Sequence, residues 1–203
     1  MKDYKSVSAV LLAAGESRRM GRPKQLLPIR DRTAIEMAIE NLLTSPVSEV
    51  IVVLGYRANE IAERISYLPV KIVINTDYTK GMSFSVKAGL RAVSDMAEGV
   101  LFALGDQPFV TSMVIDKLVS AFSQGTFIVL PVYQGRSGHP VILDIKYRQD
   151  ILEMDETLGL RQVIQKYSGD IQRIEVDSPA VLMDMDQMEE YSRQLEKFGF
   201  KTN

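Results

Sequence analysis

A short loop near the N-terminus concentrates glycines and cations in a way that suits the binding of an anion. It runs from Ala13 to Lys24 and carries two glycines and four cations, which are Gly15, Gly21, Arg18, Arg19, Arg22 and Lys24. Small residues let a backbone approach a ligand, and its N–H groups can bind phosphate oxygens. Arginine and lysine neutralise the charge of such phosphates. The loop therefore predicts phosphate binding, with a solvent-exposed basic turn as the alternative interpretation.

This loop matches neither of the two common glycine-rich phosphate-binding motifs. The P-loop motif GxxxxGK[ST] does not fit, because Arg22 and Pro23 follow Gly21. GxGxxG does not fit either, so the loop does not predict a dinucleotide site of the Rossmann type.

Carboxylates that follow later apolar runs are candidate ligands of a hard metal ion. Asp106 ends such a run and would lie at the end of a strand, although an ordinary turn explains it equally well. Asp184 and Asp186 would share one face of a later strand. Asp186 and Glu189 also match a capping box, so a helix N-cap is the alternative role for Asp186. Mg²⁺ is usually bound by one or two carboxylates together with substrate phosphates.

The composition excludes several other chemistries. The chain has 203 residues, of which 46% are hydrophobic and 25% charged, with no Cys and His139 as the one His. The absence of Cys rules out disulfides, thiolate-bound zinc, iron–sulfur clusters and a thiol nucleophile, and a single His rules out multi-His metal sites. A bound metal would need oxygen ligands, which favours Mg²⁺. The formal net charge of -2 gives no reason to expect nucleic-acid binding.

Short apolar runs alternate with amphipathic stretches, and this alternation predicts the elements that position the site. Buried strands are expected at Val10–Ala13, Val50–Leu54, Val70–Ile74, Val100–Leu104 and Phe127–Leu130. Helices are expected at Thr33–Leu43 with a capping box at Thr33 and Glu36, and at Ala58–Ser66, Ser83–Met96 and Thr111–Phe122. This order predicts an α/β fold in which a mainly parallel twisted sheet has helices on both faces. Ligands bind at the carboxyl ends of the strands in such sheets.

The pattern is less regular after Pro131. Two short strands around a Gly-rich loop are expected in Val132–Ile142, and helices are expected near Ile145–Leu152 and Leu158–Lys166. Strands are expected near Ile171–Val176 and Val181–Met185, and a last helix is expected from Gln187. No linker, repeat or low-complexity tract interrupts the chain, so we expect one domain over residues 1–203. No apolar run approaches the ~18 residues that span a membrane. The N-terminal run is interpreted as a buried strand, which predicts a cytoplasmic protein without membrane contact.

One long motif resembles the signature of the MobA-like nucleotidyltransferases, and within them it is most similar to molybdenum cofactor cytidylyltransferases. It reads Leu12-Ala-Ala-Gly-x-Ser-x-Arg19-Met-Gly21-x-x-Lys24-x-Leu-Leu-Pro28. The resemblance continues at Gly81-Met-Ser-x-Ser85, Gly105-Asp-Gln-Pro108, Gly135-x-x-Gly-His-Pro140 and Asp184-Met-Asp186, and so covers almost the whole chain. It implies a three-layer Rossmann-like nucleotidyltransferase fold. The nucleotide-binding part would cover about residues 1–110 and the acceptor-binding part about residues 111–203.

The resemblance implies a role for each motif. The residues that would bind the nucleotide are Leu12, Ala13, Ala14, Gly15, Lys24, Gly81, Ser83 and Asp106. Arg19 and Lys24 would be catalytic, because they stabilise charge on the α-phosphate and the departing pyrophosphate. Asp106 and Asp186 would bind Mg²⁺, with Asp184 outside the ligand set. For Ser83, an ordinary helix N-cap is the alternative.

The remaining motif implies an acceptor site. Gly138 and His139 would border a pterin substrate, with a structural role as the alternative for a lone His. The implied reaction is the Mg²⁺-dependent transfer of CMP from CTP to the terminal phosphate of molybdenum-molybdopterin, which releases pyrophosphate and forms molybdopterin cytosine dinucleotide. CTP is expected over GTP because the guanylyl branch typically has Ala-Gly-Gly at 13–15, where this chain has Ala13-Ala14-Gly15. A recipient molybdoenzyme or its chaperone is a further expected partner. The alternatives are a related transferase that uses GTP or a sugar phosphate, and a non-catalytic carrier of molybdenum cofactor.

Overall fold

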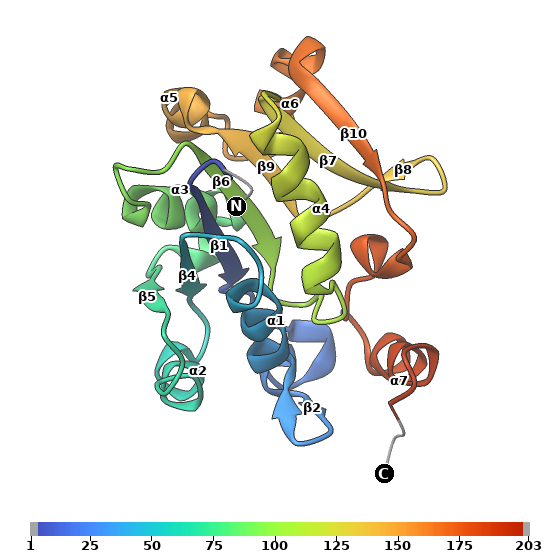
Figure 1. The fold of residues 1–203 in the computed structure, drawn as a ribbon. Helices are drawn as coiled ribbons and strands as arrows, with labels where there is room; N and C mark the ends of the chain where they lie inside the picture. The colour runs from blue at the N-terminus through green and yellow to red at the C-terminus, as the bar shows by residue number, and fades with distance from the viewer. Residues whose placement is uncertain (1–3, 201–203) are drawn as a thin grey trace.

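An eight-stranded sheet forms the centre of the computed structural model, which describes residues 4–200 (Figure 1). β1 (Val7–Ala13) lies between β4 (Glu49–Leu54) and β6 (Gly99–Leu104) and is parallel to both. β5 (Lys71–Ile74) continues the sheet, parallel to β4, to one edge. The central strands are apolar along their length because helices cover both faces of a parallel sheet. These strands confirm the first four that the sequence predicted.

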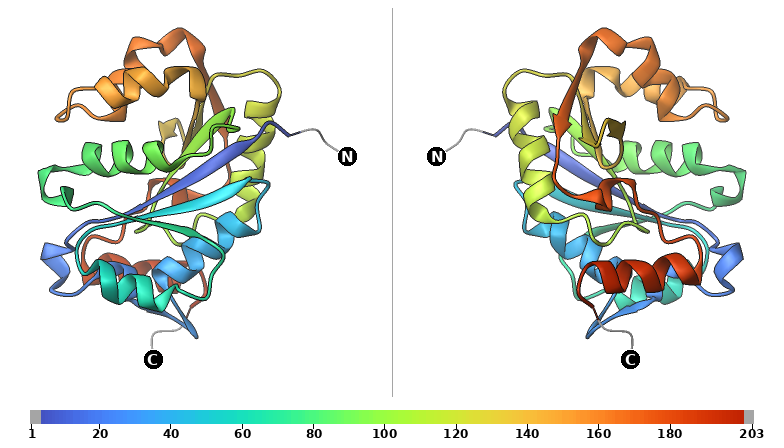
Figure 2. Two further views of the ribbon diagram at one scale, coloured as in Figure 1. Left: turned by 90° about the vertical axis from the view of Figure 1, so that its left-hand side faces the viewer. Right: turned by 90° about the vertical axis from the view of Figure 1, so that its right-hand side faces the viewer.

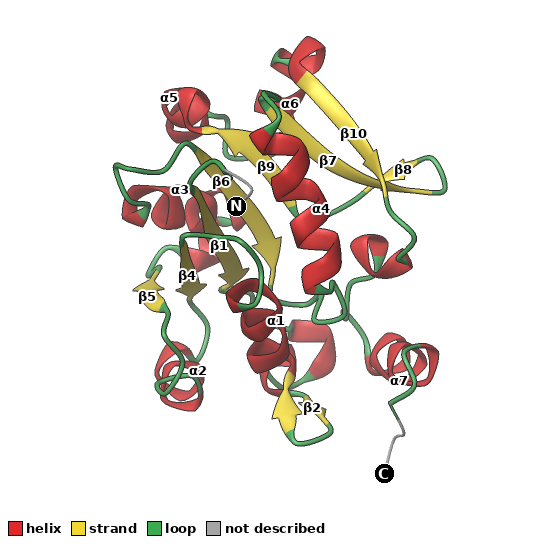
Figure 3. Ribbon diagram, in the orientation of Figure 1, coloured by secondary structure: helices red, strands yellow, loops and turns green. Residues whose placement is uncertain are grey.

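The other half of the sheet mixes strand directions. β9 (Val141–Asp144) is antiparallel to both β6 and β7 (Ile128–Tyr133), and β10 (Ile171–Glu175) is parallel to β7 at the far edge. The short β8 (Arg136–Ser137) pairs with β7. The sheet is therefore mostly parallel, as predicted, and it is antiparallel where β9 pairs with β6 and β7 and where β8 pairs with β7 (Figure 3).

Helices cover both faces of this sheet, and residues 4–200 contain seven α-helices (Figure 2). They are α1 (Ala34–Leu43), α2 (Ala58–Arg64), α3 (Met82–Ala92), α4 (Ser112–Ser123), α5 (Arg148–Glu153), α6 (Leu160–Lys166) and α7 (Met188–Lys197). The helices divide between two hydrophobic cores, one on each face of the sheet, and alternate residues of β1 belong to one core or the other. Ala9 and Leu11 belong to the core shared with α1, α2, α4 and α7, whereas Val10 and Leu12 belong to the core shared with α3, α5 and α6. In the part of the chain that is described, no helix has the length and apolar character that crossing a membrane requires.

The segment 179–185 corrects one sequence prediction. A strand was expected at Val181–Met185, but Pro179–Leu182 form a 3-10 helix and Met183 then turns to extended backbone. The Ser178 side chain accepts a hydrogen bond from the Ala180 N–H, and proline is well suited to a first helical turn. These local start signals outweigh the apolar run that predicted a strand.

Two further differences concern shorter segments. The helix predicted over Ser83–Met96 ends at Ala92, because Val93 has extended backbone. A small hairpin, β2 (Pro28–Ile29) and β3 (Arg32–Thr33), was not predicted, and its turn includes Arg30 in the left-handed region.

The capping box predicted at the start of α1 is present and extends into a buried network. Glu36 is 2% exposed and accepts hydrogen bonds from the Thr33 N–H at 2.7 Å and from the Tyr67 hydroxyl at 2.7 Å. Arg64 forms an ion pair with it at 3.0 Å. Burial raises the pKa of Glu36, but the hydrogen bonds from Thr33, Tyr67 and Arg64 outweigh burial and hold that pKa below its ordinary value.

This network predicts a component of acid sensitivity. The pKa of Glu36 is lower in the folded than in the unfolded chain. The ionised carboxylate therefore contributes fully to the stability of the fold at any pH above the pKa of the unfolded chain. This contribution is lost as the pH falls through the pKa of the folded chain. We expect Glu36→Gln to destabilise the protein by about 1–3 kcal/mol near neutral pH. Urea unfolding at neutral and acid pH measures both effects. A variant whose stability declines with acid as steeply as that of the wild type would contradict the assignment.

Candidate active site

The loop after β1 is held by a buried glutamine. Gln25 is 1% exposed, and its side-chain amide donates to the carbonyls of Ala13 at 3.0 Å and Gly15 at 3.2 Å. The Ala14 carbonyl accepts from the Tyr56 N–H at 3.1 Å, so the loop is fastened to the segment after β4. Gln25 was not among the site residues predicted from the sequence. The signal was a polar residue directly beside the apolar Leu-Leu-Pro stretch.

Four of the predicted site residues meet in one charged cluster. The Lys24 ammonium hydrogen-bonds to the Asp106 carboxylate and, at 2.8 Å, to Asp186 Oδ1. The other oxygen of Asp186 accepts from Arg19 at 2.5 Å. Lys24 and Asp106 are largely buried, with 13% and 17% of their side chains exposed. The fold thus joins the loop after β1, the end of β6 and the segment before α7.

The charges in this cluster stabilise one another. Burial lowers the pKa of Lys24, but the adjacent Asp106 and Asp186 carboxylates outweigh it, so the pKa of Lys24 is raised. The hydrogen bond from Lys24 lowers the pKa of Asp186, with Arg19 adding to the effect. Lys24 and Asp186 are therefore both charged at neutral pH.

Asp184 has a different environment from Asp186. Its carboxylate accepts a hydrogen bond from the Gln107 side-chain amide at 2.7 Å. Burial raises the pKa of Asp184, and the negative charges of Asp106 and Asp186 raise it further. Because the segment is not a strand, the expected alternation that would place both acids on one face does not apply. Of these two acids, Asp186 bonds to Lys24 and Arg19, whereas Asp184 bonds to neither of these cations within residues 4–200.

The N-cap of α7 lies one residue later than the sequence suggested. Gln187 is the N-cap and Glu190 completes the capping box, with Glu190 Oε2 accepting from the backbone N–H groups of Asp186 at 2.9 Å and Gln187 at 3.0 Å. The alternative of an N-cap at Asp186 with Glu189 is therefore wrong. The Asp186 side chain is left to face the cations.

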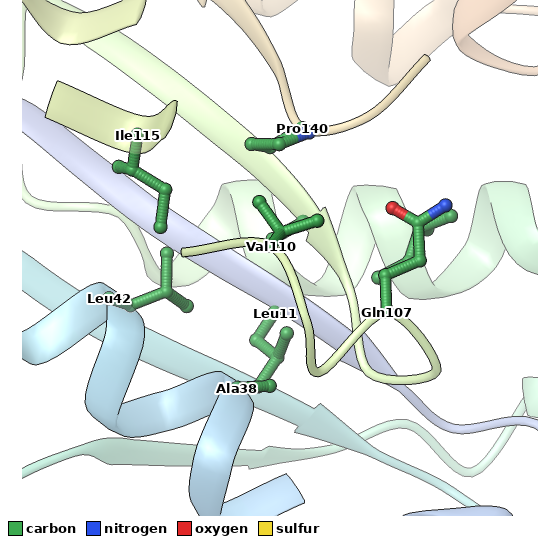
Figure 4. Close-up of a pocket in the computed structure, with 9 residues that line it drawn as sticks. Leu11, Ala38, Leu42, Gln107, Val110, Ile115 and Pro140 are labelled. Carbon is green, nitrogen blue, oxygen red and sulfur yellow. The ribbon is translucent and has the colours of Figure 1, made fainter. Parts of the chain in front are cut away.

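The loop that carries Asp106 rests on a nearly filled apolar base. A cavity of about 10 Å³ lies beneath it, between β1, α1 and α4, and it is lined by Leu11, Leu42, Val110 and Ile115 (Figure 4). That volume holds at most about one water, so the cavity is no substrate site. In Figure 4 the Gln107 amide points away from these apolar side chains, consistent with its bond to Asp184.

Two clefts that share three lining residues open on the side of the sheet that α3 covers. The smaller, of about 220 Å³, is lined by Leu12, Ala14, Gly15, Tyr78, Gly81, Met82 and Ser85. The larger, of about 450 Å³, shares Leu12, Gly81 and Met82 and is further lined by Ser83, Val86, His139 and residues 156–161. The predicted nucleotide residues Leu12, Ala14, Gly15 and Gly81 therefore lie together.

Two predicted nucleotide residues do not present free side chains here. Ala13 is 2% exposed, and its carbonyl is engaged with Gln25. Ser83 is 4% exposed, and its hydroxyl donates to the Glu156 carbonyl at 2.7 Å. Gly81, not Ser83, is the N-cap of α3. A direct contact of Ala13 or Ser83 with nucleotide stays a prediction.

The two predicted acceptor residues differ in position. His139 lines the larger cleft, and burial lowers its pKa, against the opposing charges of Asp184 and Asp106 and a hydrogen bond with the Phe102 backbone. The imidazole is therefore neutral near pH 7. Gly138 packs against the Val181 carbonyl, where a Cβ atom would clash. A glycine is required here because a larger residue does not fit, and the contact of Gly138 with an acceptor stays a prediction.

Gly138→Ala is expected to destabilise the protein by about 1–3 kcal/mol, because the new methyl group must displace the backbone at Val181. Gly169→Ala is the matched control, since a Cβ at Gly169 meets nothing within 4 Å. Thermal unfolding of both variants measures the difference. Equal stability of the two variants would contradict this prediction, because it would show that the 179–182 turn can shift to make room for the methyl group without a loss of stability.

Most of the chain matches one known protein family. Residues 9–171 match the MobA-like NTP transferase domain, which confirms the resemblance found in the motifs. The chain belongs to this nucleotidyltransferase family. The match includes β1 with its cationic loop, α3 and Asp106, and it ends before Asp184 and Asp186.

Individual relatives agree on the fold and differ in activity. The chain is 29% identical to the molybdenum cofactor cytidylyltransferase of Escherichia coli K12, over 95% of this chain and 97% of the relative. It is 32% identical to the nicotine blue oxidoreductase of Paenarthrobacter nicotinovorans, over 95% and 98%. A solved nucleotidyl transferase from Methanothermobacter thermautotroptrophicus superimposes with a TM-score of 0.83 at 27% identity, covering 95% and 97% of the two chains. Overall similarity therefore assigns the family but not the reaction, which has to be inferred from the residues of the site.

Proposed function

We propose that this protein transfers CMP from CTP to the terminal phosphate of molybdenum-molybdopterin, forming molybdopterin cytosine dinucleotide. The observation that carries the proposal is the cluster in which Lys24 bonds to both Asp106 and Asp186, with Arg19 on the far oxygen of Asp186. Two acids and two cations next to a cleft lined by Gly15 suit a nucleoside triphosphate and its counterion. The cytidylyltransferase relative supports the choice of acceptor.

Asp106 and Asp186 fit a divalent cation. Their carboxylates already converge on one positive charge, the Lys24 ammonium, and carboxylate oxygens are the ligands that Mg²⁺ prefers. Within residues 4–200 no three acidic or imidazole side chains form a metal cluster, so phosphate oxygens of the substrate would complete the coordination. Bound there, Mg²⁺ would neutralise charge on the phosphates and help orient them.

The reaction is an in-line substitution at the α-phosphorus of CTP. An oxygen of the acceptor phosphate forms the new P–O bond, the bond from the α-phosphorus to the bridging oxygen breaks, and pyrophosphate leaves with that electron pair. The acceptor phosphate is already anionic, so no strong general base is required. Lys24 and Arg19 lie where they can bind phosphate oxygens and stabilise the charge that develops as pyrophosphate departs.

The two halves of the chain would divide the substrates between them. Residues of about 1–110 supply the cleft around Gly15 and Gly81, which we assign to the nucleotide. Residues of about 111–203 supply His139 and the segment 156–161, which we assign to the acceptor. Ala14 in place of the glycine typical of guanylyl relatives supports CTP. We further propose a cytoplasmic site of action and delivery of the product to a recipient molybdoenzyme or its chaperone.

The test is product analysis by mass spectrometry after incubation with molybdenum cofactor, Mg²⁺ and either CTP or GTP. We expect pyrophosphate and the cytosine dinucleotide, with CTP used faster than GTP. A clear preference for GTP or for a sugar phosphate acceptor would favour a related transferase. Cofactor delivery to an apo-enzyme without pyrophosphate release would favour a carrier. Either result would overturn the proposal.

A further inference from the structure

One wall of the larger cleft is formed by a segment outside both the loop after β1 and the charged cluster. Residues 156–161, between α5 and the first turn of α6, line it opposite the start of α3. Two large apolar side chains remain exposed on these walls, Met82 at 63% and Leu158 at 55%. Exposed apolar side chains gathered in a cleft are typical of a ligand site. The volume of about 450 Å³ is in the range of small-molecule pockets.

Hydrogen bonds hold the two walls together before any ligand binds. The Ser83 hydroxyl donates to the Glu156 carbonyl at 2.7 Å, and Lys87 donates to the Met154 carbonyl at 3.2 Å. Lys87 also pairs with the Glu156 carboxylate at 3.7 Å. Gly159, with a positive φ of 60°, comes close to the Ser83 hydroxyl. The cleft is thus a preformed site, which lowers the entropic cost of binding.

The hydroxyl groups of Ser83 and Thr157 on the walls are already engaged within the protein. The hydroxyl of Ser83 is engaged with the Glu156 carbonyl, and that of Thr157 with the Asp155 carboxylate. A polyhydroxylated ligand would therefore lose hydrogen bonds to water that these hydroxyls do not replace. A flat ring system loses less, because aliphatic and thioether side chains pack well on its faces.

One cation in the cleft, Arg161, has no side-chain partner within the described residues. Arg161 lines the cavity and is exposed, and among residues 4–200 it forms no ion pair and no side-chain hydrogen bond. A guanidinium binds a carboxylate or a ring carbonyl through two parallel hydrogen bonds. Its place at the edge of an apolar cleft suits a ring that carries such an oxygen group.

Building on the proposed transfer to an acceptor, we infer that Met82 and Leu158 hold a planar heterocycle, and that Arg161 binds an anionic or carbonyl oxygen on this ring. These three side chains then form an acceptor subsite next to the nucleotide cleft, with Met82 on the wall that the two clefts share. They determine which acceptor ring is accepted, while the charged cluster acts on the phosphates.

Calorimetric titration with pterin-6-carboxylate, a planar heterocycle with an anionic group, tests the subsite without turnover. We expect Arg161→Ala to weaken binding roughly 10- to 100-fold, and Leu158→Ser to weaken it about 5- to 10-fold. Arg161→Lys should recover part of the loss, because it keeps the charge without the planar fork. Arg173→Ala on β10 and Met113→Ser on α4 are the matched controls, since both residues are exposed and lie outside the clefts.

Acceptor kinetics provide the second arm. Arg161→Ala should raise the KM for molybdenum cofactor by a similar factor and change kcat less than about threefold, with the Kd for CTP unchanged. Absence of pterin binding by the wild type, or equal binding by the Arg161 and Leu158 variants, would overturn the inference. Pterin binding that is lost in these variants, in a protein that releases no pyrophosphate, would support the subsite and refute the proposed reaction.

Discussion

Asp106→Asn is expected to lower the rate of pyrophosphate release about 1,000-fold, the largest effect of any single substitution that we foresee. The change removes one negative charge and keeps the shape of the side chain. Asp106 lies at the end of β6 and bonds to Lys24, so its loss weakens both the divalent cation site and the position of the ammonium. Steady-state kinetics at saturating CTP and Mg²⁺ measure the effect.

Asp184→Asn is the control for Asp106→Asn, because it removes one negative charge from the same region at a different carboxylate. Asp184 bonds to the Gln107 amide and to neither cation of the cluster, so we expect a decrease of less than about tenfold. Thermal unfolding of both variants shows whether either one is misfolded. An Asp106→Asn enzyme within about threefold of the wild-type rate would remove Asp106 from the mechanism. An Asp184→Asn enzyme that is equally impaired would place Asp184 among the metal ligands.

Lys24→Met is expected to reduce kcat by about 100- to 1,000-fold, while the KM for CTP changes by less than about tenfold. Methionine preserves much of the volume and apolar contact of lysine but carries no charge. The Lys24 ammonium matters most when charge accumulates on the departing pyrophosphate, so its removal affects the transition state more than the bound substrate. Lys197→Met, an exposed residue of α7, is the matched control. Unchanged kcat with a raised KM would show that Lys24 contributes only to binding.

The same variant has a second readout without substrate. In the present structure the ammonium lies between the carboxylates of Asp106 and Asp186. Without it the two like charges repel each other and favour a cation. Titration with Mn²⁺, followed by electron paramagnetic resonance, should therefore show tighter metal binding by Lys24→Met than by the wild type. Weaker binding would place the metal away from these carboxylates.

Much of the fold could be predicted from the sequence, because its strands and helices follow local periodicity. The apolar runs that form β1, β4, β5 and β6 are continuous, as strands buried on both faces must be. The capping box at Thr33 and Glu36 is a local signal of this kind, and the structure confirms it. Predictions failed where two local signals overlapped. Asp186 with Glu189 and Gln187 with Glu190 both satisfy a capping box, and only the packed structure selects the second.

The family, the alternation of strand and helix, and the residue types available for chemistry all follow from the sequence alone. A long motif with the order Leu12, Gly15, Arg19, Lys24 carries that information without any contact between distant segments. Tertiary structure decided which of these groups meet. Lys24 and Asp186 lie 162 positions apart, and their 2.8 Å bond depends on the register of β1 and β6 and on the turn at 179–182. Side-chain periodicity extends only over neighbouring turns, so it cannot report such pairings.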